Sequence, residues 1–271
     1  MILKNFPKHI VEPSALVETD RFLVKLAENH EEIEKAQRLR YEVFNLEQGR
    51  GLKTAEKYGI DFDEFDEYCL HIITLEKSSG KVVGTYRAHL GCVANSAKGF
   101  YSSQEYEIHG IYKIADKCLE LGRTCVSPEY RSGAAIALLW GGITELLVRA
   151  KLTYMLGCVS LEGTDPKTGW AVYEYISKNY FVSKDFTVIP RPGFKLKRPP
   201  EREIKKVLAD EEALKKSIPP VFKGYLRLGG IICGEPALDR DFGTIDFFIL
   251  VDMDKVPARY KRHFNYRENK V

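Results

Sequence analysis

The sequence predicts an α/β protein with one mixed central sheet and helices on both faces. Two observations favour this fold class. First, residues 69–75 and 82–90 are largely apolar runs that flank a KSSGK turn, in which Gly80 is placed for a hairpin. Second, the region 118–189 alternates strand-like and helix-like segments. A helix, a hairpin and then this alternation are typical of a sheet that helices cover on both sides.

The N-terminal region is predicted to contain a strand followed by a long helix. Arg21–Ala27 alternates as a half-buried strand does. Asn29 can cap a helix that runs from His30 to about Phe44, and Glu32 supports this start.

The middle of the chain supplies the alternating segments. In order they are the strand Cys118–Val126, a helix from about Ser132 to Ala150, the strand Leu152–Leu161, the helix Pro166–Tyr180 and a strand at Phe186–Ile189. The first of these helices is largely apolar, which indicates that it packs against the core.

The C-terminal part begins with a proline-rich break and contains a charged helix and a final strand. The helix is expected at Glu201–Lys216, after the prolines of residues 190–200. Tyr225–Cys233 follows a second pair of prolines, and Thr244–Val251, which is apolar almost throughout, is the last strand.

The length of 271 residues allows one domain with a sizeable core. We expect a single domain over residues 1–271, with its core at about 20–190 and a C-terminal elaboration at about 190–271. The hydrophobic content of 44% and the charged content of 29% are ordinary for a globular protein.

The formal net charge of +3 is too small to argue for nucleic acid as a partner, and none is expected. Lysine and arginine are concentrated in residues 191–206 and 255–270. Such stretches suit an acidic protein or an anionic membrane surface. They are equally common as solvated faces of helices and loops.

The six cysteines form no C-x-x-C pair, and several lie in apolar strand-like runs, where free cysteine behaves as a small hydrophobe. Residues 1–12 lack the long apolar region of a signal peptide, and no stretch approaches the ~18 apolar residues of a membrane span. We therefore expect a cytoplasmic protein, with any contact to the inner membrane being peripheral.

Charged residues gather in three places that are candidates for chemistry. These are Arg40 to Phe44 with Glu47 at the end of the first long helix, the acidic run 61–67, and Arg87 with Glu120 and Arg123 on strands. Charged side chains in apolar strands are costly to bury unless they are paired. The acidic run, through Asp63 or Asp66, can therefore pair with the strand arginines. The alternative is a carboxylate with a perturbed pKa near a cleft, which would serve as a general base.

Strand geometry sets an expectation for which of these side chains share a face. On a regular strand Glu120 and Gly122 face one side, and Leu121 and Arg123 face the other. A β-bulge would break this assignment. His71, alone in an apolar strand, is expected to be a core histidine, and no cysteine–histidine spacing indicates a metal site.

The strand that ends at Val126 leads through a loop, Arg131-Ser132-Gly133, into a helix. Loop N–H groups and the helix dipole at such a point attract an anion, usually a phosphate. Acetyltransferases of the GCN5-related superfamily have a similar loop, Gln/Arg-x-x-Gly-x-Gly/Ala, that cradles the pyrophosphate of coenzyme A. Here the glycine comes one place early. Fewer backbone donors favour an acyl donor with a single phosphodiester, as in the phosphopantetheine of acyl carrier protein.

The charged clusters together resemble the sparse signature of the acyl-homoserine-lactone synthases, which have the GCN5-related acyltransferase fold and use acyl carrier protein. The surrounding sequence more closely resembles the ornithine-acyl carrier protein N-acyltransferases, often labelled hemolysin-like. The similar stretches are RYEVFNLEQG (40–49), FDEYCLHIITLE (65–76), VVGTYRAH (82–89), residues 119–143, residues 224–252 and RYKRHF (259–264). The resemblance covers nearly the whole chain beyond the first twenty residues.

This resemblance implies transfer of a fatty acyl group, 3-hydroxyacyl in type, from a carrier thioester to the α-amine of an amino acid. Ornithine is the first expectation, with a lyso-ornithine lipid as product. An attacking amine must be neutral, so Glu120, directly or through water, would be the base, with Arg123 as the second catalytic residue. Backbone N–H groups of their strand would hold the thioester oxygen.

The remaining cluster residues would bind the acceptor. Arg87 and Arg123 would order the acidic cluster or bind the carboxylate of the amino acid. Asp63 and Asp66 would bind a cationic side chain or simply pair with those arginines. The substrate-binding group is Arg40, Phe44, Asp63, Asp66 and Arg87.

The donor-binding group is Val126, Arg131, Ser132 and Gly133. The expected donor is the acyl-phosphopantetheine of acyl carrier protein, with acyl-coenzyme A as the other option. No permanently bound cofactor and no metal are expected. Because acyl carrier proteins are acidic, such a partner would also account for the basic stretches.

Two other functions remain open. One is acyl-homoserine-lactone synthesis from S-adenosylmethionine, although the chain is long for that group and its C-terminal half follows the ornithine pattern. The other is a non-enzymatic, hemolysin-like membrane-active protein. A lytic protein needs insertable or amphipathic segments, whereas the apolar runs here have the pattern of strands in one core.

Overall fold

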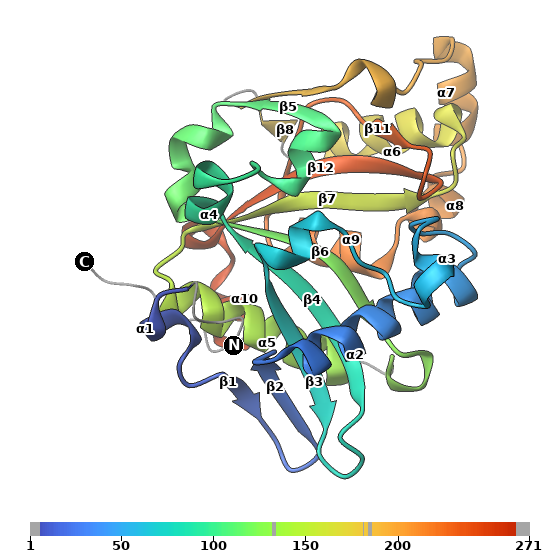
Figure 1. The fold of residues 1–271 in the computed structure, drawn as a ribbon. Helices are drawn as coiled ribbons and strands as arrows, with labels where there is room; N and C mark the ends of the chain where they lie inside the picture. Colours follow the sequence, from blue (N-terminus) through green and yellow to red (C-terminus); the bar gives the residue numbers. More distant parts are fainter. Residues whose placement is uncertain (1–5, 132–133, 181, 184–185, 264–271) are drawn as a thin grey trace.

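The computed structural model describes residues 6–131, 134–180, 182–183 and 186–263 (Figure 1). Ten of the strands form one central sheet. Across the sheet they are β1 (Ala15–Glu18), β2 (Phe22–Leu26), β3 (Leu70–Glu76), β4 (Val82–Leu90), β6 (Cys118–Val126), β7 (Tyr154–Glu162), β12 (Thr244–Asp252), β10 (Ile231–Cys233) and β8 (Val182–Ser183), with β11 (Ala237–Asp239) paired to β12. The β6–β7 and β10–β8 pairs are parallel and the others antiparallel, so the predicted mixed sheet is confirmed.

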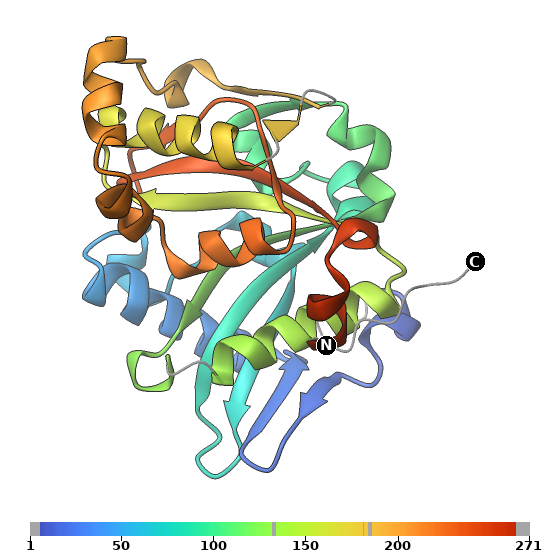
Figure 2. The same ribbon diagram turned by 180° about the vertical axis from the view of Figure 1, so that it is seen from behind.

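Helices cover both faces of the sheet, which Figures 1 and 2 show from opposite sides. One face carries α2 (His30–Tyr41) and α4 (Gly91–Ser96), and the other carries α5 (Ala134–Arg149), α6 (Pro166–Asn179) and α9 (Pro220–Arg227). The remaining helices are α1 (Lys8–Val11), α3 (Ala55–Tyr58), α7 (Glu201–Leu208), α8 (Glu211–Ser217) and α10 (Ala258–His263). A second sheet pairs β5 (Tyr106–His109) with β9 (Thr187–Pro190). It packs on the same side of the central sheet as α4, where Tyr106 and Ile108 belong to one apolar cluster with Phe248 of β12.

Several predicted boundaries agree with the structure. Strand β6 has the predicted bounds, and the β3–β4 hairpin turns at Gly80, whose φ is +66°. At the start of α2, the Asn29 side chain accepts a hydrogen bond from the Glu32 N–H at 3.0 Å. Local capping and turn chemistry therefore account for these elements.

Three predicted elements differ. Helix α2 ends at Tyr41, and the chain continues as a π-helix over Glu42–Glu47. The charged helix is two helices, α7 and α8, because Asp210 caps α8 by accepting from the Ala213 N–H at 3.0 Å. The strand predicted near residue 187 is β9, and it pairs with β5 instead of joining the central sheet. Residues beyond 190 supply β10, β11 and β12 of that sheet.

Strands β6 and β7 are neighbours over a short distance only. Their register pairs Cys118–Glu120 with Tyr154–Leu156, and both strands continue beyond these pairs without meeting again. Where they part, Gly157 lies against β6, and a Cβ at this position would lie 2.4 Å from the Leu121 carbonyl oxygen. Only glycine permits this approach. The sheet therefore opens in its middle.

Candidate active site

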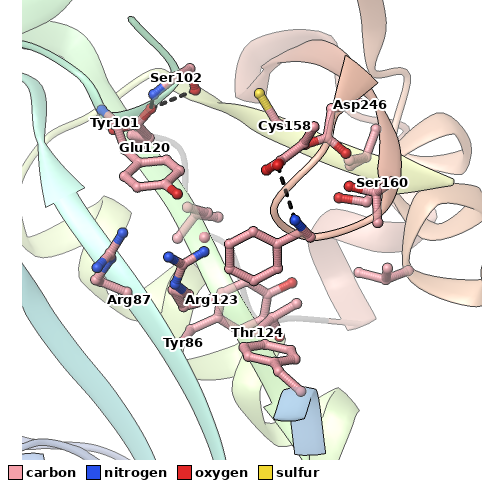
Figure 3. Close-up of a pocket in the computed structure, with 18 of the residues that line it drawn as sticks. Tyr86, Arg87, Tyr101, Ser102, Glu120, Arg123, Thr124, Cys158, Ser160 and Asp246 are labelled. Carbon is pink, nitrogen blue, oxygen red and sulfur yellow. Dashed lines mark hydrogen bonds between the residues drawn. The ribbon is translucent and has the colours of Figure 1, made fainter. Parts of the chain in front are cut away.

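A cavity of about 280 Å³ lies where β6 and β7 separate. Residues 121–124 of β6 and 158–160 of β7 line it, together with side chains from β4 and β12. Figure 3 shows Arg87 and Arg123 on one side of this cavity and Asp246 on the opposite side. The cavity thus has basic groups on one wall and acidic groups on another.

Arg123 lies at a β-bulge in β6. The register between β4 and β6 shifts between Thr85 and Arg87, where β6 accommodates an extra residue between Gly122 and Cys125. Arg123 itself has a φ of +50°, in the left-handed region that few non-glycine residues adopt. Both Arg123 and Glu120 line the cavity, so the regular alternation of faces expected for this strand is wrong here.

Asp63 joins the two arginines of the cavity wall. Arg87 Nη1 donates to Asp63 Oδ1 at 2.6 Å, and Arg123 Nη2 donates to Oδ2 at 3.1 Å. Oδ1 also accepts from the Phe65 N–H at 2.8 Å, which caps a 3₁₀ helix over Glu64–Glu67. The predicted pairing of the acidic run with the strand arginines is confirmed, and both Asp63 oxygens are engaged in it.

Arg40 forms a second, deeper pair of salt bridges. Its Nη2 lies 2.8 Å from Asp66 Oδ1, and its Nε lies 2.8 Å from Asp61 Oδ1, with Arg40 only 1% exposed. Burial alone would raise the pKa of Asp66, but Arg40, Arg87 and His71 lower it to about 2. Arg40, Asp61 and Asp66 do not line the cavity. Their predicted part in substrate binding would be exerted through the arginines that do.

His71 is a core histidine, as predicted. It is 1% exposed, and its Nε2 lies 3.0 Å from the Asp66 carbonyl oxygen. Burial lowers the pKa of His71 to about 4, so the imidazole is neutral at physiological pH.

Glu120 is held by the start of a 3₁₀ helix, Tyr101–Gln104, and not by the arginines. Its Oε2 accepts from the Tyr101 N–H at 2.6 Å, and its Oε1 accepts from the Ser102 N–H at 2.8 Å and from the Ser102 hydroxyl at 2.6 Å (Figure 3). His89 Nδ1 lies 3.6 Å from Oε2, and neither His89 ring nitrogen has a hydrogen-bond partner in the described part of the chain. The buried carboxylate of Glu120 thus lines the cavity, and its Oε2 accepts one hydrogen bond, from the Tyr101 N–H.

Of the predicted donor-binding residues, Val126 and Arg131 do not line the cavity, and Arg131 lines a neighbouring pocket with Glu47. Phe44, predicted for the acceptor, lines the cavity. Arg131 Nε donates to the Val126 carbonyl oxygen at 2.9 Å, and Nη2 donates to Glu47 Oε2 at 2.7 Å. The guanidinium is therefore already paired with a carboxylate at a half-exposed position. Ser132 and Gly133 lie outside the described residues.

Three buried carboxylates on the cavity wall escape the sequence prediction: Glu105, Asp239 and Asp246. Their exposures are 4%, 8% and 5%, and one oxygen of each lies within 4.8 Å of the other two. Burial, reinforced by Asp239, raises the pKa of Asp246 to about 6, and burial with Asp246 raises that of Glu105 well above its usual value. A lone carboxylate inside the apolar strand β12 is the one sequence signal that points to Asp246.

Comparison with known proteins identifies the family. A family model described as an acetyltransferase (GNAT) domain matches residues 39–141. An L-ornithine N(alpha)-acyltransferase of Brucella abortus (strain 2308) is 33% identical over 261 residues, which cover 91% of this chain and 90% of that protein. The chain belongs to the L-ornithine N(alpha)-acyltransferase family. A relative of the same name from Agrobacterium fabrum (strain C58 / ATCC 33970) is 30% identical, covering 91% of this chain and 86% of its own length.

Family membership confirms the GCN5-related fold and makes the protein an acyltransferase. A solved structure agrees on the fold: FeeM, an N-acyl amino acid synthase from uncultured soil microbes, has a TM-score of 0.51 at 10% identity, covering 87% of this chain and 94% of that chain. Among the described residues of this acyltransferase, no helix is both long and apolar enough to cross a bilayer. The cavity, with arginines on one wall and carboxylates on another, is its candidate active site.

Proposed function

We propose that this acyltransferase moves a 3-hydroxyacyl type fatty group from a thioester to the α-amine of an amino acid, ornithine first. The names of its relatives support the amino acid, and the cavity between β6 and β7 carries the proposal. That cavity places an acidic side chain, two arginines and the unpaired main chain of β6 around one space. We also propose that residues 1–271 form a single acyltransferase domain.

The reaction joins the amine nitrogen to the acyl carbon while the carbon–sulfur bond breaks. The amine loses a proton to a base, and the thiolate that leaves takes up a proton. Glu120 is the proposed base, directly or through a water bound at the oxygen that accepts only the Tyr101 N–H. Main-chain N–H groups of β6 beyond Glu120, which β7 does not pair, would hold the thioester oxygen as its negative charge develops.

Arg123 and Arg87 would bind the α-carboxylate of the acceptor, because a guanidinium can donate two parallel hydrogen bonds to a carboxylate. Asp63 holds both arginines at the cavity wall. Arg40, through Asp66, would anchor this group, and the partly buried side chain of Phe44 would line the path to it. We assign Asp63 and Asp66 to holding these arginines, since their oxygens have arginine partners.

The donor is proposed to be the acyl-phosphopantetheine of acyl carrier protein. Arg131, with the loop that contains Ser132 and Gly133 and the strand end at Val126, would bind its phosphodiester by exchanging Glu47 for the phosphate. The basic stretch 191–206 offers a limited docking surface, because Arg198 pairs with Glu174 and Lys205 with Glu201. Peripheral contact with an anionic membrane is a further proposal, supported by the exposed side chains Leu46, Tyr58 and Phe62.

One assay tests the proposed function. Purified enzyme is mixed with 3-hydroxyacyl carrier protein or with the matching coenzyme A thioester, and released thiol is followed with a panel of amino acids. We expect release with the carrier thioester and ornithine, and an N-acylated product by mass spectrometry. Absence of release with every amine would refute the proposal. Equal turnover with both thioesters would remove acyl carrier protein as the specific donor.

A further inference from the structure

The acidic end of the cavity is the one part of its wall that the proposed chemistry leaves unused. Three carboxylates there are each more than nine-tenths buried, and no arginine or lysine forms a salt bridge with any of them in the described part of the chain. Three ionised carboxylates within 4.8 Å of one another are strongly unfavourable without a cation. Such a group is therefore either partly protonated or binds a cationic ligand.

Two oxygens of this group lack a hydrogen-bond donor in the part of the chain that the structure describes, and the side chains of Glu105 and Asp246 also contact each other. Glu105 Oε2 and Asp246 Oδ1 are buried and lack a hydrogen-bond donor among the described residues. Asp239 is oriented by its own loop, since Oδ1 accepts from the Asp241 N–H at 2.9 Å and from the Phe242 N–H at 3.0 Å. Buried acceptors without donors are rare in folded proteins, and these two border a cavity large enough for a ligand.

We propose that Glu105, Asp239 and Asp246 bind the side-chain ammonium of the amino-acid acceptor, and so select an acceptor with a terminal amine over one with a neutral side chain. This inference rests on the proposed function and names the specificity determinant of the same site. An alkylammonium has three N–H donors, which matches a set of three carboxylates. Three carboxylates would also suit a divalent metal that keeps several water ligands, so the test below includes a chelator.

The layout of charges supports the same orientation. Arg123 lies on the opposite side of the cavity from Asp246 (Figure 3). An amino acid whose α-carboxylate binds Arg123 and whose side-chain ammonium binds the carboxylates would therefore span the cavity. Its α-amine would lie between the two ends, on the side where Glu120 lines the wall. The ring of Phe242, 4.5 Å from the Arg123 guanidinium, offers an apolar surface for the methylene chain between them.

The test compares ornithine with norvaline, which has the same carbon chain but no terminal amine. In the thiol-release assay, Asp246→Asn and Glu105→Gln are each measured with both amino acids. Glu212→Gln is the control, because Glu212 is exposed on α8 and does not line the cavity. We expect the ornithine-to-norvaline ratio of kcat/KM to fall at least tenfold in both variants, mainly through the KM for ornithine. The kcat/KM for norvaline should stay within threefold of the unmutated enzyme.

Calorimetric titration of the enzyme with ornithine gives a readout that does not require turnover. Ornithine should bind the unmutated enzyme and bind at least tenfold more weakly to both variants, even if no thiol is released and the proposed function fails. An unchanged ratio, or an equal loss with both amino acids, would overturn the inference. So would loss of ornithine binding on adding a chelator with recovery on adding magnesium, which would assign the group to a metal. If Asp246→Asn does not fold, as judged by circular dichroism, Glu105→Gln decides.

Discussion

The Arg123 guanidinium donates to Asp63 Oδ2 at 3.1 Å from a backbone whose φ is +50°. A non-glycine residue in this region carries a strain of about 1–3 kcal/mol, which persists only when the surroundings require it. Here the surroundings are Asp63 and two aromatic rings, Tyr101 and Phe242, within 5.1 Å and 4.5 Å of the guanidinium carbon. The position of Arg123 is therefore fixed from both ends of the side chain.

We expect the Arg123–Asp63 contact to be coupled energetically. A double-mutant cycle with Arg123→Ala, Asp63→Ala and the double variant should give a coupling free energy of about 1–3 kcal/mol in chemical denaturation, because the pair is largely buried. The same single variants should lower kcat/KM for the acceptor at least tenfold. Strictly additive stabilities would show that the contact contributes nothing of its own, and Arg38→Ala with Glu34→Ala is an exposed comparison pair.

Glu120→Gln should lower kcat about a hundredfold if Glu120 is the base, since a positioned base contributes roughly 10²–10⁴. The substitution replaces an acceptor by an amide whose nitrogen cannot accept from the Tyr101 or Ser102 N–H. Unfolding must therefore be measured alongside turnover, with a loss of about 1–3 kcal/mol expected. Glu129→Gln, at an exposed site, is the control. A folded variant with unchanged kcat would remove Glu120 from the mechanism.

Glu47→Ala should lower the KM for the phosphopantetheine donor severalfold. The substitution removes the carboxylate that occupies Arg131, so a phosphodiester no longer has to displace it. Arg131→Ala should have the opposite effect, and Lys81→Ala, in a more exposed ion pair, serves as control. Steady-state kinetics with varied carrier thioester measure both. A higher KM in Glu47→Ala would show instead that the glutamate orients the arginine.

Gly157→Ala should destabilise the protein by about 1–3 kcal/mol and disturb the site. Its new Cβ would meet the Leu121 carbonyl oxygen at 2.4 Å, so β6 and β7 would have to move apart or shift. Gly224→Ala is the matched control, because nothing lies within 4 Å of a Cβ there and the residue is in helix α9. That control should gain up to about 1 kcal/mol. Thermal and urea unfolding of the two variants compare them directly.

Asp246→Asn should gain stability relative to the unmutated protein as pH rises. The folded-state pKa of Asp246, about 6, lies above its usual value of 3.8, so the folded state holds a proton that the unfolded state releases. The stabilisation from this proton is complete below about pH 4 and is lost progressively as pH rises through 6. Asparagine cannot lose that proton. A stability difference between variant and unmutated protein that stays constant from pH 4 to 8 would contradict this account.

Local patterns predicted most of the elements but not how distant ones meet. The bounds of β6 and the cap at Asn29 follow from nearest neighbours in the chain, and burial cost alone predicted that arginines on strands must pair with the acidic run. The bulge at Arg123 has no such signal, because it is defined by the pairing of β6 with β4, and the sequence of β6 alone does not show which residue is unpaired. Glu105 meets Asp246 only through the packing of β5 and β12, more than a hundred residues apart.

The match to the acetyltransferase (GNAT) family model ends between β6 and β7, the two strands that part at the cavity. The region shared with acetyltransferases, residues 39–141, includes β6, Arg87 and Arg123 but ends before β7 begins. Asp239 and Asp246 lie beyond it, on the other half of the sheet. The arginines and two of the three acidic residues of the cavity are thus encoded by separate stretches of the chain, whereas Glu105 lies in the same stretch as the arginines. Substitutions in the C-terminal stretch can therefore change Asp239 and Asp246 without changing Arg87 or Arg123.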